Sequence, residues 1–103
     1  MNRGDIYEAE LPVGGRRPAA VVSRDTLIPL LTAITVAGIT STIRGLPTEV
    51  PVGSQHGLDR DCVVNCNDLA TLPKARLGRH RGRLGPGELV RLDQALRIAL
   101  ALD

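Results

Sequence analysis

The chain has 103 residues, the size of one small domain, and this length excludes two separate hydrophobic cores. Its one aromatic residue is Tyr7, so the core must be aliphatic, while 23% charged residues and a net charge of +2 argue against wholesale disorder. Eleven glycines and seven prolines favour short strands and turns over a bundle of long helices.

The N-terminal part of the chain predicts two strands joined by a glycine turn. Residues 4–11 show the alternation of a strand, and residues 18–23 are apolar enough for a second, largely buried one. A short helical turn is expected over residues 25–31, with Asp25 as its cap and Pro29 distorting it.

The middle of the chain is rich in β-branched residues and predicts two further strands. One is expected over residues 32–42 with a kink at Gly38, and another over residues 48–52. Because Pro51 cannot donate a hydrogen bond to a neighbouring strand, the second of these should lie at a sheet edge.

The next segment predicts the last strands of the domain. Residues 62–66 and 76–84 read as strands, the second interrupted by Gly78 and Gly82. A short turn is expected between them over residues 67–73.

The C-terminal segment predicts one amphipathic helix that begins at residues 85–88. Pro86 suits the first helical position, and Glu88 suits the positive end of the helix dipole. The apolar positions recur at helical spacing and are widened by four more: Leu89, Leu92, Leu96 and Ala99, with Val90, Ile98, Leu100 and Leu102. This helix is expected to pack either on a barrel or on a partner chain. Five to seven short strands with this helix predict a mainly β fold, a small and strongly bent barrel with the helix on its outside.

The two cysteines are expected to be reduced thiols. If residues 62–66 form a strand, Cys62 and Cys66 share a face at a separation of roughly 13 Å, too far for a disulfide. No second pair of cysteines or histidines stands nearby to complete a zinc site. Free buried thiols are typical of an intracellular protein, so a cytoplasmic location is expected.

Neither a signal peptide nor a membrane span is expected. Charged residues follow the initial methionine at once, with no apolar stretch behind them. The long charge-free segment over residues 26–43 contains Pro29, Gly38 and many hydroxyl groups, which favours a buried strand after a helical turn.

Basic residues concentrate near the end of the predicted sheet. Five of the 13 lie within ten positions, without an acidic residue among them: Lys74, Arg76, Arg79, Arg81 and Arg83. This cluster is consistent either with a polyanionic partner or with a solvated basic strand.

Familiar catalytic motifs are absent. The chain lacks a phosphate-binding glycine loop, a dinucleotide fingerprint, a serine elbow and a zinc-protease motif. His56 and His80 are the two histidines, and no carboxylates are spaced to complete a metal site with them, so neither a metal nor a cofactor is expected.

Two short polar segments are candidate phosphate-binding groups. Arg16 and Arg17 stand before Pro18 at the start of a strand, where a guanidinium could neutralise a phosphodiester or could simply be solvated. Thr40 and Ser41 end the most apolar strand, and their hydroxyls could bind a ligand phosphate or satisfy local backbone groups.

A series of short blocks extends in order along nearly the whole chain. They read RGDIY (3–7), GRRPAAVVS (15–23), ITS (39–41), LPTEV (46–50), GLDRDCVV (57–64), TLPKARL (71–77) and GRL (82–84). Each block is weak alone, but the ordered set resembles the MazF/PemK toxin endoribonucleases of type II toxin–antitoxin systems.

This resemblance implies a single toxin domain over residues 1–103 with an SH3-like barrel of the CcdB/MazF type. It implies a homodimer that cleaves single-stranded RNA sequence-selectively without a metal. It also implies a cognate antitoxin whose disordered acidic tail occupies the RNA groove.

The resemblance also implies a mechanism and a set of site residues. The ribose 2′-OH attacks the adjacent phosphate and leaves a 2′,3′-cyclic phosphate and a 5′-OH. The family's catalytic arginine falls on Arg17 and its threonine on Thr40, with Ser41 as a possible helper. The RNA-contacting groups expected alongside them are Arg16, Arg44, Asn67, Lys74 and Arg76.

Three features depart from the family pattern. The loop over residues 11–15 is shorter than in many relatives and lacks their acidic residue, and residues 68–71 lack an arginine that the block often contains. Without aromatic platforms, bases must be held by hydrogen bonds and aliphatic surfaces.

Neither Arg17 nor Thr40 is a good general base near neutral pH, so His56 or His80 is a candidate for that role.

Two alternative functions remain on the same fold. One is a non-catalytic inhibitor like CcdB, which binds a topoisomerase through its C-terminal helix. The other is a barrel that binds RNA or protein without cleaving it. The pairing of Arg17 with Thr40 favours the nuclease, because a pure protein-binding module does not need it.

Overall fold

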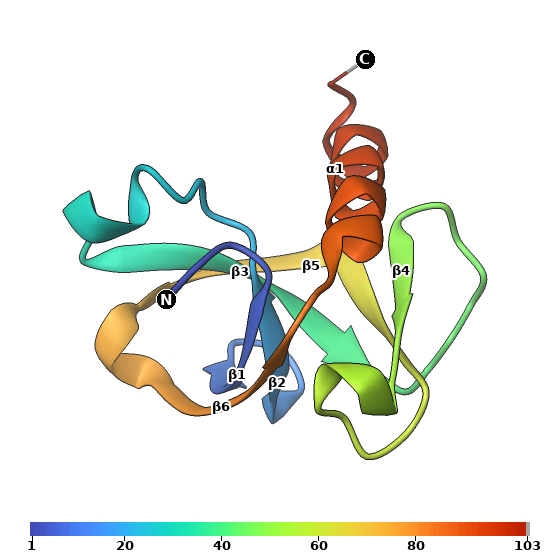
Figure 1. Ribbon diagram of the computed structural model, residues 1–103, viewed down its shortest axis with the longest axis horizontal. Coiled ribbons are helices and arrows are strands. Elements are labelled where there is room, and N and C mark those ends of the chain that lie inside the picture. The colour runs from blue at the N-terminus through green and yellow to red at the C-terminus, as the bar shows by residue number, and fades with distance from the viewer. Residues whose placement is uncertain (103) are drawn as a thin grey trace.

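Six strands form one curled antiparallel sheet in the computed structural model, which describes residues 1–102 (Figure 1). The sheet order is β4-β5-β3-β2-β1-β6, and α1 packs against β4 and β5. The mainly β fold with a C-terminal helix is therefore confirmed. The elements are β1 (Asp5–Leu11), β2 (Gly15–Val21), β3 (Ala33–Thr40), β4 (Glu49–Val52), β5 (Cys62–Pro73), β6 (Leu77–Arg83) and α1 (Pro86–Leu100), with 3-10 helices η1 (Ile28–Leu30), η2 (Ser54–His56) and η3 (Lys74–Arg76).

β5 is one long strand, so the turn predicted over residues 67–73 is wrong. The second half of β5 pairs with β3, from Ala37↔Leu69 to Ala33↔Pro73, and these backbone bonds hold it extended. β2 also begins earlier than predicted, because Gly15 and the two arginines after it pair with the end of β1.

Gly38, where the sequence predicts a kink, lies at a bulge between β3 and β5 whose extra residues belong to β5. Ala37 pairs with Leu69 and Ile39 pairs with Val64, so Gly38 faces the whole stretch of residues 65–68. A bulge of this kind bends the strand and re-aims the side chains of the extra residues. Residues 65–68 thereby have no partner in β3, although Asn65 still pairs with Glu49 of β4.

The predicted edge position of β4 is also confirmed. β4 is the outermost strand beside β5, and Pro51 lies opposite Val63. An edge tolerates proline because the missing N–H would otherwise point away from the sheet.

Asp25 does not cap a helical turn, contrary to the prediction. The residue at the cap position of η1 is Leu27, which makes no side-chain cap. The Asp25 carboxylate instead accepts a hydrogen bond of 2.7 Å from the Arg3 backbone N–H, and so it ties the N-terminus to the loop after β2.

The core is aliphatic, as expected, and α1 closes one side of it. Leu92 and Ala95 are fully buried against Ile6, Val50 and Val64 from the sheet. Leu89, Leu96 and Ala99 pack partly against this cluster. The four residues that widen the predicted apolar face do not pack on this sheet and are exposed in the single chain: Val90, Ile98, Leu100 and Leu102.

Both cysteines are free thiols, as predicted. Cys66 is buried, and its burial raises the pKa of the thiol to about 11. Cys62 is half-buried, and burial also raises its pKa. Within residues 1–102 no helix is long and apolar enough to cross a membrane.

Candidate active site

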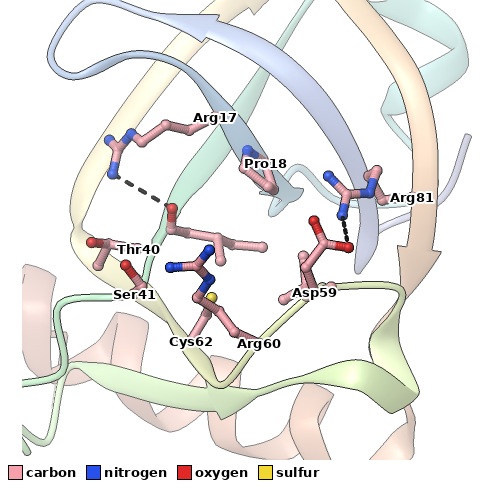
Figure 2. A pocket seen from close by; sticks show the side chains of 10 residues that line it. Arg17, Pro18, Thr40, Ser41, Asp59, Arg60, Cys62 and Arg81 are labelled. Carbon is pink, nitrogen blue, oxygen red and sulfur yellow. Dashed lines mark hydrogen bonds and ion pairs between the residues drawn. The ribbon is translucent and has the colours of Figure 1, made fainter.

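Arg17 lies in β2, where it pairs with Ala9 of β1, and its side chain extends across β3 toward β5. Its Nη2 donates to the Asp68 carboxylate at 2.6 Å and to the Val13 carbonyl at 3.2 Å. Its Nη1 donates to the Ile39 carbonyl at 3.5 Å, close to Thr40 and Ser41 (Figure 2). The Arg17 guanidinium is therefore held at its far end by groups from three different segments.

The Arg17 side chain is partly enclosed. A quarter of its side-chain surface is exposed, as is a quarter of that of Asp68. The Arg17 Nε is buried and has no partner among the described residues, so the two terminal nitrogens make all of its polar contacts. A guanidinium group that is always charged and restricted in orientation is suited to binding a phosphate oxygen.

Thr40 is the last residue of β3, and Ser41 follows it at the surface. The Thr40 hydroxyl accepts a hydrogen bond of 3.1 Å from the backbone N–H of Thr42, which steadies the chain as it leaves the sheet. The hydroxyl hydrogen remains free to donate to a ligand. Of the two roles that the sequence left open for Thr40, this bond shows the local structural one, and it leaves the hydroxyl hydrogen available for the other.

Arg17 and Thr40 line two adjoining pockets and form the wall between them. The first, here called the Arg60 pocket, has a volume of about 260 Å³. The second, here called the Asn67 pocket, has a volume of about 460 Å³. The polar groups of the Arg60 pocket are Arg17, Thr40, Ser41, Asp59, Arg60, Cys62 and Arg81. Those of the Asn67 pocket are Arg17, Thr40, Thr42, Arg44, Glu49, Asn65, Asn67 and Asp68.

The Asn67 pocket owes its polar lining to the bulge in β5. Asn65, Asn67 and Asp68 lie in the bulged stretch and line the pocket together with Arg17 and Thr40. Asn67 is anchored there, because its side-chain Nδ2 donates to the Thr48 hydroxyl at 2.6 Å.

The loop between β3 and β4 closes the same pocket from the other side. One oxygen of Glu49 accepts the backbone N–H groups of Arg44, Gly45 and Leu46 at 3.1, 2.9 and 3.3 Å. This single carboxylate shapes the loop, which brings the exposed Arg44 to the pocket.

The Arg60 pocket carries a second concentration of positive charge. The Arg81 side chain is 10% exposed and is held by Glu8 at 2.5 Å and by Asp59 at 3.5 Å. Arg60 is exposed, and Figure 2 shows its guanidinium beside Thr40 and Ser41. Three arginines consequently surround this pocket: Arg17, Arg60 and Arg81.

The structure separates the predicted RNA-contacting residues into two groups. Arg44 and Asn67 line the Asn67 pocket, whereas Arg16, Lys74 and Arg76 line neither pocket. The Lys74 ammonium donates to the Ile28 carbonyl and so holds η1 against η3. Arg16 extends over Gly78 of β6.

Neither histidine lines the two pockets. His56 is buried, with its Nδ1 accepting the Gly53 N–H and its Nε2 near Glu88 of α1. His80 stands edge-on to Tyr7 and lies 3.6 Å from Asp5. Within residues 1–102 no group of three or more histidine, cysteine or acidic side chains is placed to hold a metal ion.

Sequence reasoning missed Asp68, Asn65 and Arg60, and it named Arg81 only as a member of the basic cluster over residues 74–83. A signal for Asp68 was present: the short loop before Arg16 lacks its expected acid, which invites a search for another acid near Arg17. The sequence alone does not pair Asp68 with Arg17, because only the sheet order brings β5 near β2.

Comparison with known proteins supplies the context for this cleft. The family described as "PemK-like, MazF-like toxin of type II toxin-antitoxin system" matches residues 2–100. Endoribonuclease MazF3 of Mycobacterium tuberculosis is 42% identical over 87 residues, which cover 84% of each chain. Endoribonuclease MazF of Staphylococcus epidermidis is 34% identical over 112 residues, which cover 100% of this chain and 93% of the relative.

Solved structures agree with the sequence relatives. The Mycobacterium tuberculosis toxin MazF-mt6 superposes with a TM-score of 0.89 at 40% identity, covering 96% of this chain and 98% of that one. A mycobacterial endoribonuclease in complex with its cognate antitoxin superposes with a TM-score of 0.89 at 29% identity, covering 100% and 97%.

Proposed function

This chain belongs to the family of PemK-like, MazF-like toxins of type II toxin–antitoxin systems, and we propose that it cleaves RNA where Arg17 and Thr40 meet. The chain is an endoribonuclease toxin by its relationship to the curated MazF endoribonucleases. The proposal concerns the site, the mechanism and the partners. It depends above all on one observation, that two residues far apart in the sequence line the same two pockets.

The proposed reaction is attack of the ribose 2′-OH on the adjacent phosphorus. The 2′-O–P bond forms and the P–O5′ bond breaks, which leaves a 2′,3′-cyclic phosphate and a 5′-OH. The Arg17 guanidinium stabilises the extra negative charge on the phosphorane oxygens, and the Thr40 O–H donates to one of them. Neither histidine lines the pockets, and the proposed step passes the 2′-OH proton to water while the 5′-oxygen takes its proton from water.

Ser41 is the proposed second hydroxyl of this site. It follows Thr40 directly and lines the Arg60 pocket with it, at the point where the Arg17 fork approaches the end of β3 (Figure 2). It therefore supports the phosphate without being the first donor to it.

The two pockets suit the nucleotides on either side of the cleaved bond. Arg44 and Asn67 offer donors in one pocket, and Arg60 and Arg81 offer them in the other. No aromatic side chain lines either pocket, so base recognition depends on hydrogen bonds, and this requires single-stranded RNA with its bases turned outward. Arg16, Lys74 and Arg76 lie beyond the pockets and are proposed to contact more distant phosphates.

We also propose the partners that the family implies. One solved neighbour is an endoribonuclease in complex with its cognate antitoxin. For this chain, an acidic antitoxin segment would lie across the arginine-lined pockets and compete with RNA for them. Assembly as a homodimer and a cytoplasmic location belong to the same proposal.

The test is cleavage of a long, lightly structured RNA by purified protein in excess EDTA. We expect fragments with 5′-OH ends from the wild-type protein and none from Arg17→Ala. Arg97→Ala, which removes the same charge from the far end of α1, is the matched control and should cleave normally. RNA that stays intact with the wild-type protein would overturn the proposal and favour a binding module on the same fold. Arg17→Ala that cleaves like wild type would overturn the proposed site.

A further inference from the structure

Asp68 is the acidic side chain in contact with Arg17. Its Oδ2 lies 2.6 Å from the Arg17 Nη2, and both side chains are one-quarter exposed. A direct guanidinium–carboxylate bond with partial burial is stronger and more directional than an exposed surface pair. The Arg17–Asp68 pair therefore has the strength to set where the guanidinium points.

The backbone is shaped to let this pair form. Arg17 and Asp68 come from β2 and β5, and β3 lies between those strands. The pair closes above Gly38 of β3, where a Cβ atom would lie 2.3 Å from the Asp68 Oδ2 and 3.0 Å from the Arg17 Nη2. The missing side chain at residue 38 and the bulge at residues 65–68 together open the path between the two charges.

The other two acidic residues that line the pockets bond to groups other than Arg17. The Glu49 oxygen in the Asn67 pocket accepts three backbone N–H groups of its own loop. Asp59 in the Arg60 pocket contacts Arg81 and has a side chain that is 88% exposed. Asp68 alone among the carboxylates lining the two pockets bonds to Arg17.

We propose that Asp68 is a positioning residue for RNA cleavage, acting through Arg17. It holds Nη2, which leaves Nη1 as the terminal nitrogen beside Thr40 and the scissile phosphate. It also offsets the charge of Arg17, so that the RNA ground state is not bound too tightly. This inference rests on the proposed function, because it presumes that Arg17 acts on the phosphate.

Loss of the Asp68 carboxylate should change RNA binding and the rate of cleavage in opposite directions. Without the Asp68 charge, Arg17 attracts RNA more strongly but points less accurately, and misplacement of a catalytic group by about 1 Å costs on the order of 100-fold in rate. Asp68→Ala should therefore lower the maximal cleavage rate by about 100-fold, while the protein concentration for half-maximal rate stays equal or falls. Asp68→Asn keeps an acceptor oxygen and should lose about tenfold.

The experiment is single-turnover cleavage of the same long RNA with protein in excess, at several salt concentrations. Asp93→Asn is the matched control, because Asp93 forms a 2.7 Å ion pair with Arg3 far from the two pockets. The control should keep the wild-type rate and half-maximal concentration. Thermal melting of every variant separates a folding defect from a positioning defect.

The outcomes are distinct. The inference is supported if the Asp68 variants have a lower maximal cleavage rate while the protein concentration for half-maximal rate is unchanged or lower and the melting temperature is unchanged. Wild-type rates in both Asp68 variants, or a rate loss matched by Asp93→Asn, overturn it while Arg17→Ala remains inactive. If Arg17→Ala itself cleaves normally, the proposed function fails and the role of Asp68 fails with it.

Discussion

The buried imidazole of His56 lies 3.2 Å from the Glu88 carboxylate, so the 3-10 helix η2 is tied to the first turn of α1. The same Glu88 oxygen accepts the backbone N–H of Gly85 at 2.9 Å, at the position where α1 begins. His56 is thus a structural residue that fixes the helix on the sheet, and it stands outside the pockets that Arg17 lines.

This arrangement predicts a pH-dependent contribution of Glu88 to stability. The Gly85 backbone bond, and then the His56 side chain, hold the pKa of Glu88 below its usual 4.5. A lowered folded-state pKa stabilises the protein above the unfolded pKa, and this contribution is lost as the pH falls through the folded value.

Glu88→Gln keeps an acceptor oxygen for the Gly85 N–H but removes the negative charge in the first turn of α1, so it should lower the free energy of unfolding at pH 7 by about 0.3–1 kcal/mol. The difference from wild type should shrink below pH 4.5. Urea unfolding at pH 7 and in the acid range measures it, with exposed Glu10→Gln as the control. A difference that stays constant with pH would contradict this account.

Arg17→Lys tests whether the planar guanidinium group contributes to cleavage beyond its positive charge. Lysine keeps the positive charge but cannot contact a phosphate, the Ile39 carbonyl and Asp68 with one rigid group. We expect cleavage to fall by about 100-fold, as for loss of one preorganised donor to a transition-state oxyanion. The circular dichroism spectrum should not change, and near-normal cleavage would reduce the role of Arg17 to charge alone.

Thr40→Val removes a hydroxyl and keeps the β-branched shape that suits the end of β3. Cleavage should fall by about 10- to 100-fold, because one donor to the phosphate is lost. Thr35→Val removes a hydroxyl that pairs with Thr71 outside the pockets, and it should cleave like wild type. Rates measured under single-turnover conditions compare the two variants, and equal rates would remove Thr40 from the mechanism.

Gly38→Ala places a methyl group where the Arg17–Asp68 pair now closes. The backbone of Gly38 needs no positive φ, so the strand should persist while the two side chains shift apart. Cleavage should fall by about tenfold or more, because the guanidinium is displaced. Gly87→Ala, with no atom near its added methyl, is the control, and equal loss in both variants would exclude a local effect.

Leu92→Ala tests the contribution of α1 to the core. Leu92 is fully buried, so its truncation should cost about 2–5 kcal/mol of unfolding free energy. Leu100→Ala, on the exposed side of the same helix, should change it by less than about 0.5 kcal/mol. Chemical denaturation gives both values, and similar costs would mean that the helix packs with a different face.

Local signals account for much of what was predictable. The aliphatic core, the proline-limited edge strand and the Pro86 start of α1 each depend on the properties of a few neighbouring residues. The errors came where long-range pairing overrode local preference. The polar run before Pro73 suggests a turn, yet it is extended because its backbone bonds go to β3.

The sequence by itself determined the fold class, the family and the candidate pair Arg17 and Thr40, because ordered motifs and side-chain chemistry are local properties of the chain. Only the tertiary structure decided that Asp68 holds Arg17 and that the two histidines lie outside the pockets. It also decided that Arg60 and Arg81 join Thr40 around one pocket. The physical reason is the sheet: strand order and the bulge set which side chains meet, and both arise from hydrogen bonds between segments distant along the chain.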